Sequence, residues 1–104
     1  MGTKEILDTS VAIERDGGVV TVFSVVEYPP CGDEPFEVIF PDVTDYIKAV
    51  DVANRLRKIG KPIGAVDILI SAMCLNRSAR LITNDKDFKN IKEIYPNFEL
   101  VLND

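Results

Sequence analysis

Three aspartates stand where a carboxylate is either unusual or well placed for chemistry: Asp8, Asp67 and Asp85. Asp8 closes a short apolar run that is typical of a buried strand, and Asp85 comes soon after a second such run, 81–83. Ligands of parallel α/β sheets bind beyond the carboxyl ends of the strands, so acids at these two places are positioned for chemistry. Each also has a structural interpretation, because an acid after a strand can cap the helix that follows.

Asp67 lies in the most apolar segment of the chain, between Ala65-Val66 and Ile68-Leu69-Ile70. An unpaired buried carboxylate costs on the order of several kcal/mol, so something must compensate for Asp67. A salt bridge or the dipole at the first turn of a helix would do so. Isolated acids of this kind also mark functional sites, which is the interpretation we favour.

Two further acids have strong structural explanations. Glu27 completes the sequence Ser24-Val25-Val26-Glu27, which fits the S-x-x-E capping box at the start of a helix. Asp87 stands three residues after Asn84, which is an acceptable capping arrangement. Alone, neither acid indicates a site.

Together the acids predict a metal site. If the strands before Asp8 and Asp85 are parallel, both carboxylates emerge at one edge of the sheet, and Asp67 can point across from the preceding helix. Carboxylates gathered so closely repel one another and hold protons unless a cation lies between them. An all-oxygen ligand set selects Mg²⁺ or Mn²⁺, and such ions activate water for in-line attack on a phosphodiester.

The composition supports this chemistry by exclusion. The 104 residues include 17 Asp and Glu and 12 Lys and Arg, which gives a formal net charge of −5, and they include no histidine. Without imidazole, Ser-His-Asp and Cys-His nucleophiles, HExxH zinc sites and Cys₂His₂ fingers are all excluded. The acidic balance argues against a purely electrostatic nucleic-acid binder, but not against a nuclease whose acids are neutralised by metal.

The length predicts one domain, residues 1–104, and no stretch has the composition of a linker. Cys31 and Cys74 form no CxxC motif, so we expect reduced thiols. The acidic, weakly apolar start does not fit a signal peptide, and no apolar run approaches the roughly 20 residues of a membrane span. We therefore expect a cytoplasmic protein without membrane contact.

Apolar patterning predicts strands at 6–8, 36–40, 81–83 and 98–102, while 19–26 fits either a strand or, at its end, a helix start. Short strands that alternate with helices indicate βα units and an α/β fold, a three-layer sandwich with a short, mainly parallel central sheet flanked by helices. The Pro-rich segment 29–35 is expected to be a loop.

Three helices are expected between these strands. The first begins after Asp42 or Thr44 and ends before Gly60, and its apolar stripe consists of Val43, Ile47, Val50, Ala53, Leu56 and Ile59. The second begins near Pro62, runs through Leu75 and is apolar nearly all round, which predicts burial on most faces. The third, over 84–95, is short.

The motifs resemble those of the PIN-domain ribonucleases, especially the VapC-type toxins of prokaryotic toxin-antitoxin pairs, in a shortened form. The most specific are Ile63-Gly64-Ala65-Val66-Asp67-Ile68-Leu69-Ile70-Ser71-Ala72 and Leu81-Ile82-Thr83-Asn84-Asp85-Lys86-Asp87-Phe88. Ile6-Leu7-Asp8-Thr9-Ser10 and Ser24-Val25-Val26-Glu27 are similar to the family's first two motifs. The long first helix and the helical hairpin usual in the family have no room here.

The resemblance implies a metal-dependent endoribonuclease whose site is made by Asp8, Glu27, Asp67 and Asp85. By matching position, Asp8, Asp67 and Asp85 would ligate Mg²⁺ or Mn²⁺, and Glu27 would hold a ligand water or assist its deprotonation. Supporting roles fall to Ser10, Thr83 and Asp87. The resemblance also implies an RNA substrate, an antitoxin protein that inserts a basic side chain into the acidic site, and a homodimer.

A second hypothesis stays open: a non-catalytic PIN-like binding module whose acidic pocket receives a basic partner segment. Two groups of cations could contact phosphates or could simply form solvated helix faces, which is the interpretation we favour. These groups are Arg55, Arg57, Lys58 and Lys61, and Lys86, Lys89 and Lys92.

Overall fold

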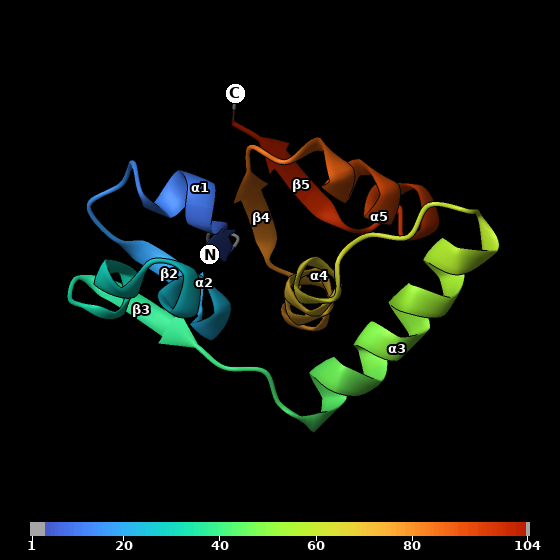
Figure 1. The fold of residues 1–104 in the computed structure, drawn as a ribbon, viewed down its shortest axis with the longest axis horizontal. Helices are drawn as coiled ribbons and strands as arrows, with labels where there is room; N and C mark the ends of the chain where they lie inside the picture. The colour runs from blue at the N-terminus through green and yellow to red at the C-terminus, as the bar shows by residue number, and fades with distance from the viewer. Residues whose placement is uncertain (1–3, 104) are drawn as a thin grey trace.

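The computed structural model describes residues 4–103, and its five short strands all run parallel to their neighbours (Figure 1). One sheet has the order β1-β4-β5, and β2 pairs with β3 beside it. The strands are β1 (Glu5–Leu7), β2 (Gly18–Thr21), β3 (Phe36–Ile39), β4 (Arg80–Thr83) and β5 (Glu99–Leu102). The predicted parallel α/β fold is therefore confirmed.

Helical segments connect the strands. They are α1 (Thr9–Ala12), α2 (Val22–Glu27), η1 (Pro29–Gly32), α3 (Val43–Lys58), α4 (Ala65–Arg77), η2 (Lys86–Phe88) and α5 (Lys89–Ile94). Helix α4 is viewed nearly end-on at the centre of Figure 1, between α3 and the strands. No helix among the described residues combines the length and apolar character that crossing a membrane requires.

Both faces of the central sheet are covered, as its alternating side chains show. Ile6 and Leu81 pack into a core with α3, α4 and α5, whereas Leu7 and Ile82 pack into a second core with α1 and β2. Successive residues of a strand point to opposite faces of the sheet. Of two neighbouring residues such as Ile6 and Leu7, each therefore contributes to a different core. The three-layer arrangement follows from these short apolar strands.

Close approach between β2 and β1 depends on Gly18. Its φ is +137°, and a Cβ atom built there would lie 2.7 Å from Leu7 Cδ1. Only glycine combines this backbone conformation with so little space. Strand β2 can thus lie against β1 without displacing the residue that precedes Asp8.

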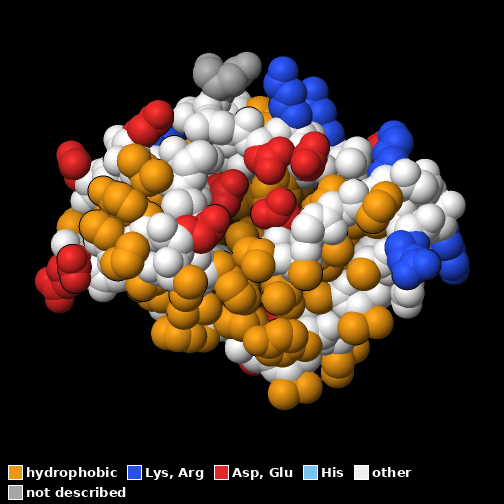
Figure 2. All heavy atoms as spheres, in the orientation of Figure 1, with side chains coloured by type: hydrophobic (Ala, Val, Ile, Leu, Met, Phe, Trp, Pro, Cys, Tyr) orange, Lys and Arg blue, Asp and Glu red, His pale blue; other side chains and the backbone are white. Residues whose placement is uncertain are grey.

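The predicted bounds of α3 agree with the structure, but the predicted buried stripe is wrong. Val43, Ile47 and Val50 are 62–72% exposed, and Ile59 is also exposed. The residues that α3 buries are Asp45, Ala49, Val52 and Leu56. Of the predicted stripe, only Leu56 belongs to the core. The side chains of Val43, Ile47 and Val50 therefore face solvent. Figure 2 shows that exposed apolar side chains cover much of the lower half of the face that it draws.

The buried face of α3 is set by a carboxylate. Asp45 is fully buried and accepts two hydrogen bonds of 2.9 Å from the Arg77 guanidinium of α4, one on each oxygen. The predicted cap Asp42 is confirmed, because its side chain and that of Asp45 form a reciprocal capping box. An acid paired in this way can lie in the interface between two helices.

Four local expectations need correction. Helix α2 begins at Val22, so Ser24 lies inside it and forms no capping box with Glu27. The 29–35 segment contains the short helix η1 rather than loop alone. In the expected helix over 84–95, Asp85 rather than Asn84 caps η2, and α5 begins only at Lys89. Helix α4 buries its later turns, but Ala65 and Val66 in its first turn are exposed.

Candidate active site

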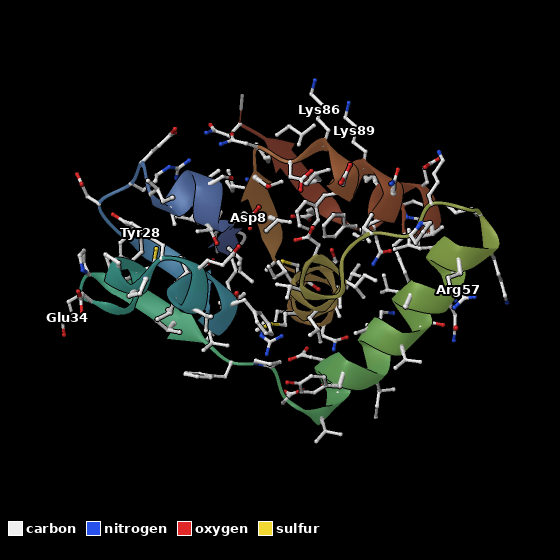
Figure 3. All side chains as sticks on the ribbon, viewed as in Figure 1. Asp8, Tyr28, Glu34, Arg57, Lys86 and Lys89 are labelled. Carbon is white, nitrogen blue, oxygen red and sulfur yellow. The ribbon has the colours of Figure 1, made fainter. Side chains whose placement is uncertain are left out.

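One open pocket of about 440 Å³ lies beyond the carboxyl ends of β1 and β4. It is lined by Asp8, Thr9, Ser10, Glu27, Asp67, Asn84 and Asp85. The four acids expected to be catalytic therefore share one pocket, although they come from four different parts of the chain. Figure 2 shows acidic side chains gathered near the middle of one face, and Figure 3 labels Asp8 there, between α1 and β4.

Asp8 is held at the junction of the two strands. Its backbone N–H donates to the Ile82 carbonyl of β4 over 2.9 Å. One carboxylate oxygen accepts the Thr9 backbone N–H at 3.0 Å, and the other accepts the Thr83 hydroxyl at 2.7 Å. The capping interpretation of Asp8 is thus correct, and it is compatible with a place in the pocket.

Thr83 connects Asp8 to Asp85. Its fully buried hydroxyl donates to Asp8 and accepts the backbone N–H of Asp85 at 3.0 Å. The Asp85 side chain in turn accepts the Asp87 backbone N–H at 2.9 Å, which caps η2. Thr83 therefore fixes the distance between two acids, whereas the Asp87 side chain is exposed and does not line the pocket.

Glu27 reaches the pocket from the last residue of α2. The Thr9 hydroxyl lies 2.7 Å from Glu27 Oε1 and 2.8 Å from the hydroxyl of Ser24, which is buried. Sequence reasoning missed Thr9 and Ser24. The available signals were the position of Thr9 next to Asp8 and the three-residue spacing of Ser24 and Glu27, which puts both on one helix face.

Asp67 lies in the first turn of α4 and is half-buried. The Ser71 hydroxyl donates to its backbone carbonyl at 2.8 Å. In the described part of the chain, no Lys or Arg forms an ion pair with Asp67, Asp8 or Asp85. The salt bridge offered as a structural explanation of Asp67 is thus not found.

Two of the pocket acids, Asp67 and Asp8, have a raised pKa. Burial, followed by the charges of Asp8 and Asp85, raises the pKa of Asp67 to about 6. Burial also raises the pKa of Asp8, against the opposing hydrogen bonds from Thr83 and Thr9. The pocket therefore has an excess of negative charge that a bound cation would relieve.

The donor chemistry fits a hard divalent ion, because every polar side-chain atom of the acids is an oxygen. Within residues 4–103, no three Asp, Glu, Cys or His side chains are arranged so that they could hold an ion.

The two groups of cations do not face the pocket. Arg57, Lys86 and Lys89 extend from the outer surface, away from Asp8 (Figure 3). Lys61 pairs with Glu93, and Arg55 pairs with Asp51. These contacts agree with solvated helix faces.

The family model of the PIN domain matches residues 32–94, a range that includes Asp67 and Asp85. No curated protein matches the chain.

Solved structures of similar fold cover nearly the whole chain. VapBC-1 from nontypeable Haemophilus influenzae has a TM-score of 0.76 and 21% identity over 96% of this chain and 98% of that one. VapBC2 from Rickettsia felis, bound to a DNA fragment from the promoter, has a TM-score of 0.75 and 18% identity over 98% and 100%. At these identities the likeness establishes the fold.

Proposed function

The chain belongs to the PIN domain family, whose model matches more than half of it, and from this premise we propose that it is a metal-dependent endoribonuclease that hydrolyses RNA phosphodiester bonds. The observation that carries the proposal is the pocket itself. Asp8, Glu27, Asp67 and Asp85 line it together, and none of these four acids has a cationic side chain paired with it in the described chain.

Asp8, Asp67 and Asp85 are the proposed ligands of Mg²⁺ or Mn²⁺. A bound ion of this kind lowers the pKa of water and stabilises charge on phosphate oxygens, chemistry that needs no histidine. Glu27 is proposed to hold or deprotonate the attacking water. Its exposure suits this role, because the carboxylate can exchange its proton with solvent.

The remaining polar residues are proposed to keep the acids in place. Thr83 orients Asp8 and Asp85 through its two hydrogen bonds. Ser10 lines the pocket and is exposed, so it can orient a ligand or a water molecule. Asp87 contributes negative charge, which also raises the pKa of Asp67.

We further propose that the protein acts as the toxin of a cytoplasmic toxin-antitoxin pair, with an antitoxin and a second copy of the chain as partners. The support is the likeness of the fold to the VapBC structures of Haemophilus influenzae and Rickettsia felis. The acidic pocket is suited to receiving a basic side chain from an inhibitor.

The test is cleavage of mixed-sequence RNA oligonucleotides by the purified protein, with Mn²⁺ and with excess chelator. We expect Mn²⁺-dependent cleavage that falls roughly 100-fold or more in Asp8→Asn and Asp67→Asn. Asp16→Asn, which changes an exposed acid outside the pocket, serves as the matched control and should keep wild-type activity. Equal cleavage by all four proteins would refute the proposal. Binding of a basic peptide without any cleavage would favour the non-catalytic module.

A further inference from the structure

Thr9 connects the two helices that flank the pocket on one side. Its hydroxyl lies within 2.8 Å of both Ser24 Oγ and Glu27 Oε1. A hydroxyl carries a single hydrogen, and a carboxylate oxygen can only accept, so Thr9 donates to Glu27 and accepts the hydrogen of Ser24. The result is a chain of two hydrogen bonds from a buried hydroxyl to an exposed carboxylate.

Glu27 has little else to hold it. It is the last residue of the six-residue helix α2, and Tyr28 and Pro29 follow with non-helical backbone and a new short helix. Within residues 4–103, its side chain makes no other hydrogen bond and no ion pair. A free glutamate side chain samples several rotamers, and fixing it requires a compensating contact.

Ser24 provides the fixed end of this connection. It is 1% exposed and lies one helical turn before Glu27, so its own position is set by packing. Thr9 follows Asp8 directly, and its backbone N–H donates to the Asp8 carboxylate. One residue thus contacts two of the four pocket acids, through its backbone and through its side chain.

We propose that Thr9 is a positioning residue that holds the Glu27 carboxylate toward the pocket, with Ser24 as its anchor. The effect of Thr9 on catalysis rests on the proposed function. The single orientation of Glu27 does not depend on metal or RNA. Thr9 acts through Glu27 and Asp8 and is itself no ligand.

The test compares Thr9→Val, Thr9→Ser and Thr21→Val. Thr9→Val keeps the shape and removes the hydroxyl, and Thr9→Ser keeps the hydroxyl. Thr21→Val is the control, because it makes the same change at a threonine near the start of α2 whose hydroxyl has no hydrogen-bond partner among the described groups. Three-bond NMR couplings about Glu27 χ1 report the rotamer, and titration calorimetry reports Mn²⁺ affinity.

We expect a single Glu27 rotamer in the wild type, Thr9→Ser and Thr21→Val, and averaged couplings in Thr9→Val. Loss of a residue that orients a metal-site group typically lowers metal affinity or activity about 10- to 100-fold, so Thr9→Val should lose that much in Mn²⁺ affinity or in kcat, with KM for RNA little changed. Unchanged couplings in Thr9→Val would overturn the inference, as would an equal effect of Thr21→Val. If the wild type neither binds Mn²⁺ nor cleaves RNA, the proposed function fails, while the couplings still decide the role of Thr9.

Discussion

Asp45 and Asp67 occupy similar positions in their helices but have charged neighbours of opposite sign. Each lies in the first turn of a long helix, where the helix dipole favours a negative charge to a similar degree. Asp45 accepts two hydrogen bonds from Arg77 and one from Asn76, whereas Asp67 has other carboxylates as its charged neighbours. The difference between them therefore arises mainly from partners outside the helices that carry them.

Their pKa values differ in direction for this reason. Burial by itself would raise the pKa of Asp45, but the hydrogen bonds from Arg77, the Asp42 backbone and Asn76 lower it below its usual value. Burial and neighbouring acids raise the pKa of Asp67 to about 6. An acid that the fold pairs with a cation stabilises the fold, and an acid that the fold leaves among other acids is available to a cation from solution.

The largest effect is expected from breaking the paired site. Arg77→Met leaves the Asp45 carboxylate buried without its cation, and loss of one partner of a buried pair costs about 3–5 kcal/mol. Urea denaturation followed by circular dichroism should show this decrease in the free energy of unfolding. Arg57→Met, on the exposed face of α3, is the control and should change stability by less than about 0.5 kcal/mol. Similar values for both variants would mean that Asp45 does not depend on Arg77.

The unpaired site should respond to metal instead. A ligand that binds only the folded state at 100 times its Kd stabilises that state by about 2.7 kcal/mol. Mn²⁺ should therefore raise the melting temperature of the wild type, and chelator should reverse the increase. Asp67→Asn should remove most of it, while Arg57→Met should leave it intact. A Tm that does not respond to Mn²⁺ would show that the pocket acids bind no ion with useful affinity.

The paired site also explains why the buried face of α3 could not be predicted. The spacing typical of a buried stripe is found in Val43, Ile47 and Val50, which are exposed. The face of α3 that is buried begins with the carboxylate Asp45, so apolar periodicity predicts the wrong face. The partner of Asp45 is Arg77, at the far end of another helix. Periodicity is a local signal and carries no information about such a contact.

The pocket was more predictable than the helix face. The positions of Asp8 and Asp85 near strand ends, together with the parallel sheet, predict that they share one edge, and the structure brings them to one pocket with Glu27 and Asp67. The Thr9 hydrogen bond to Glu27 was not predictable in this way, because it joins two helices whose relative placement is tertiary. The capping box expected at Ser24 failed because strand β2 ends earlier and α2 begins at Val22.

A smaller effect, of opposite sign at the two acids, is expected from pH. Asp67 has a pKa of about 6 in the folded chain and about 3.9 when unfolded, so between these values the folded state binds more protons. Stability should rise as pH falls from 7 toward 4, by about 1 kcal/mol, because solvent screens the half-exposed side chain. Asp45, with its lowered pKa, contributes stability that is present above about pH 4 and is lost below it.

Urea denaturation of the wild type and Asp67→Asn between pH 4.5 and 7, in chelator, measures this contribution. The variant should be more stable than the wild type at pH 7, and its stability should depend less on pH over this interval. Asp16→Asn is the control for loss of an ordinary exposed acid and should keep the wild-type dependence. A variant that keeps the full wild-type slope would assign the dependence to other groups, with Asp8 the next to test because burial raises its pKa in the same direction.

The smallest effect concerns a buried polar group that is unpaired but neutral. The Thr21 hydroxyl is buried at the N-cap position of α2 and has no partner among the described side chains and backbone groups. Valine has nearly the same shape and removes a hydroxyl that has lost its bonds to water, so Thr21→Val should be neutral or stabilising by up to about 1 kcal/mol. Thr83→Val, which removes a fully bonded hydroxyl between Asp8 and Asp85, is the contrast and should destabilise the fold by about 1–3 kcal/mol. Comparable losses in both variants would indicate that Thr21 bonds to water in solution.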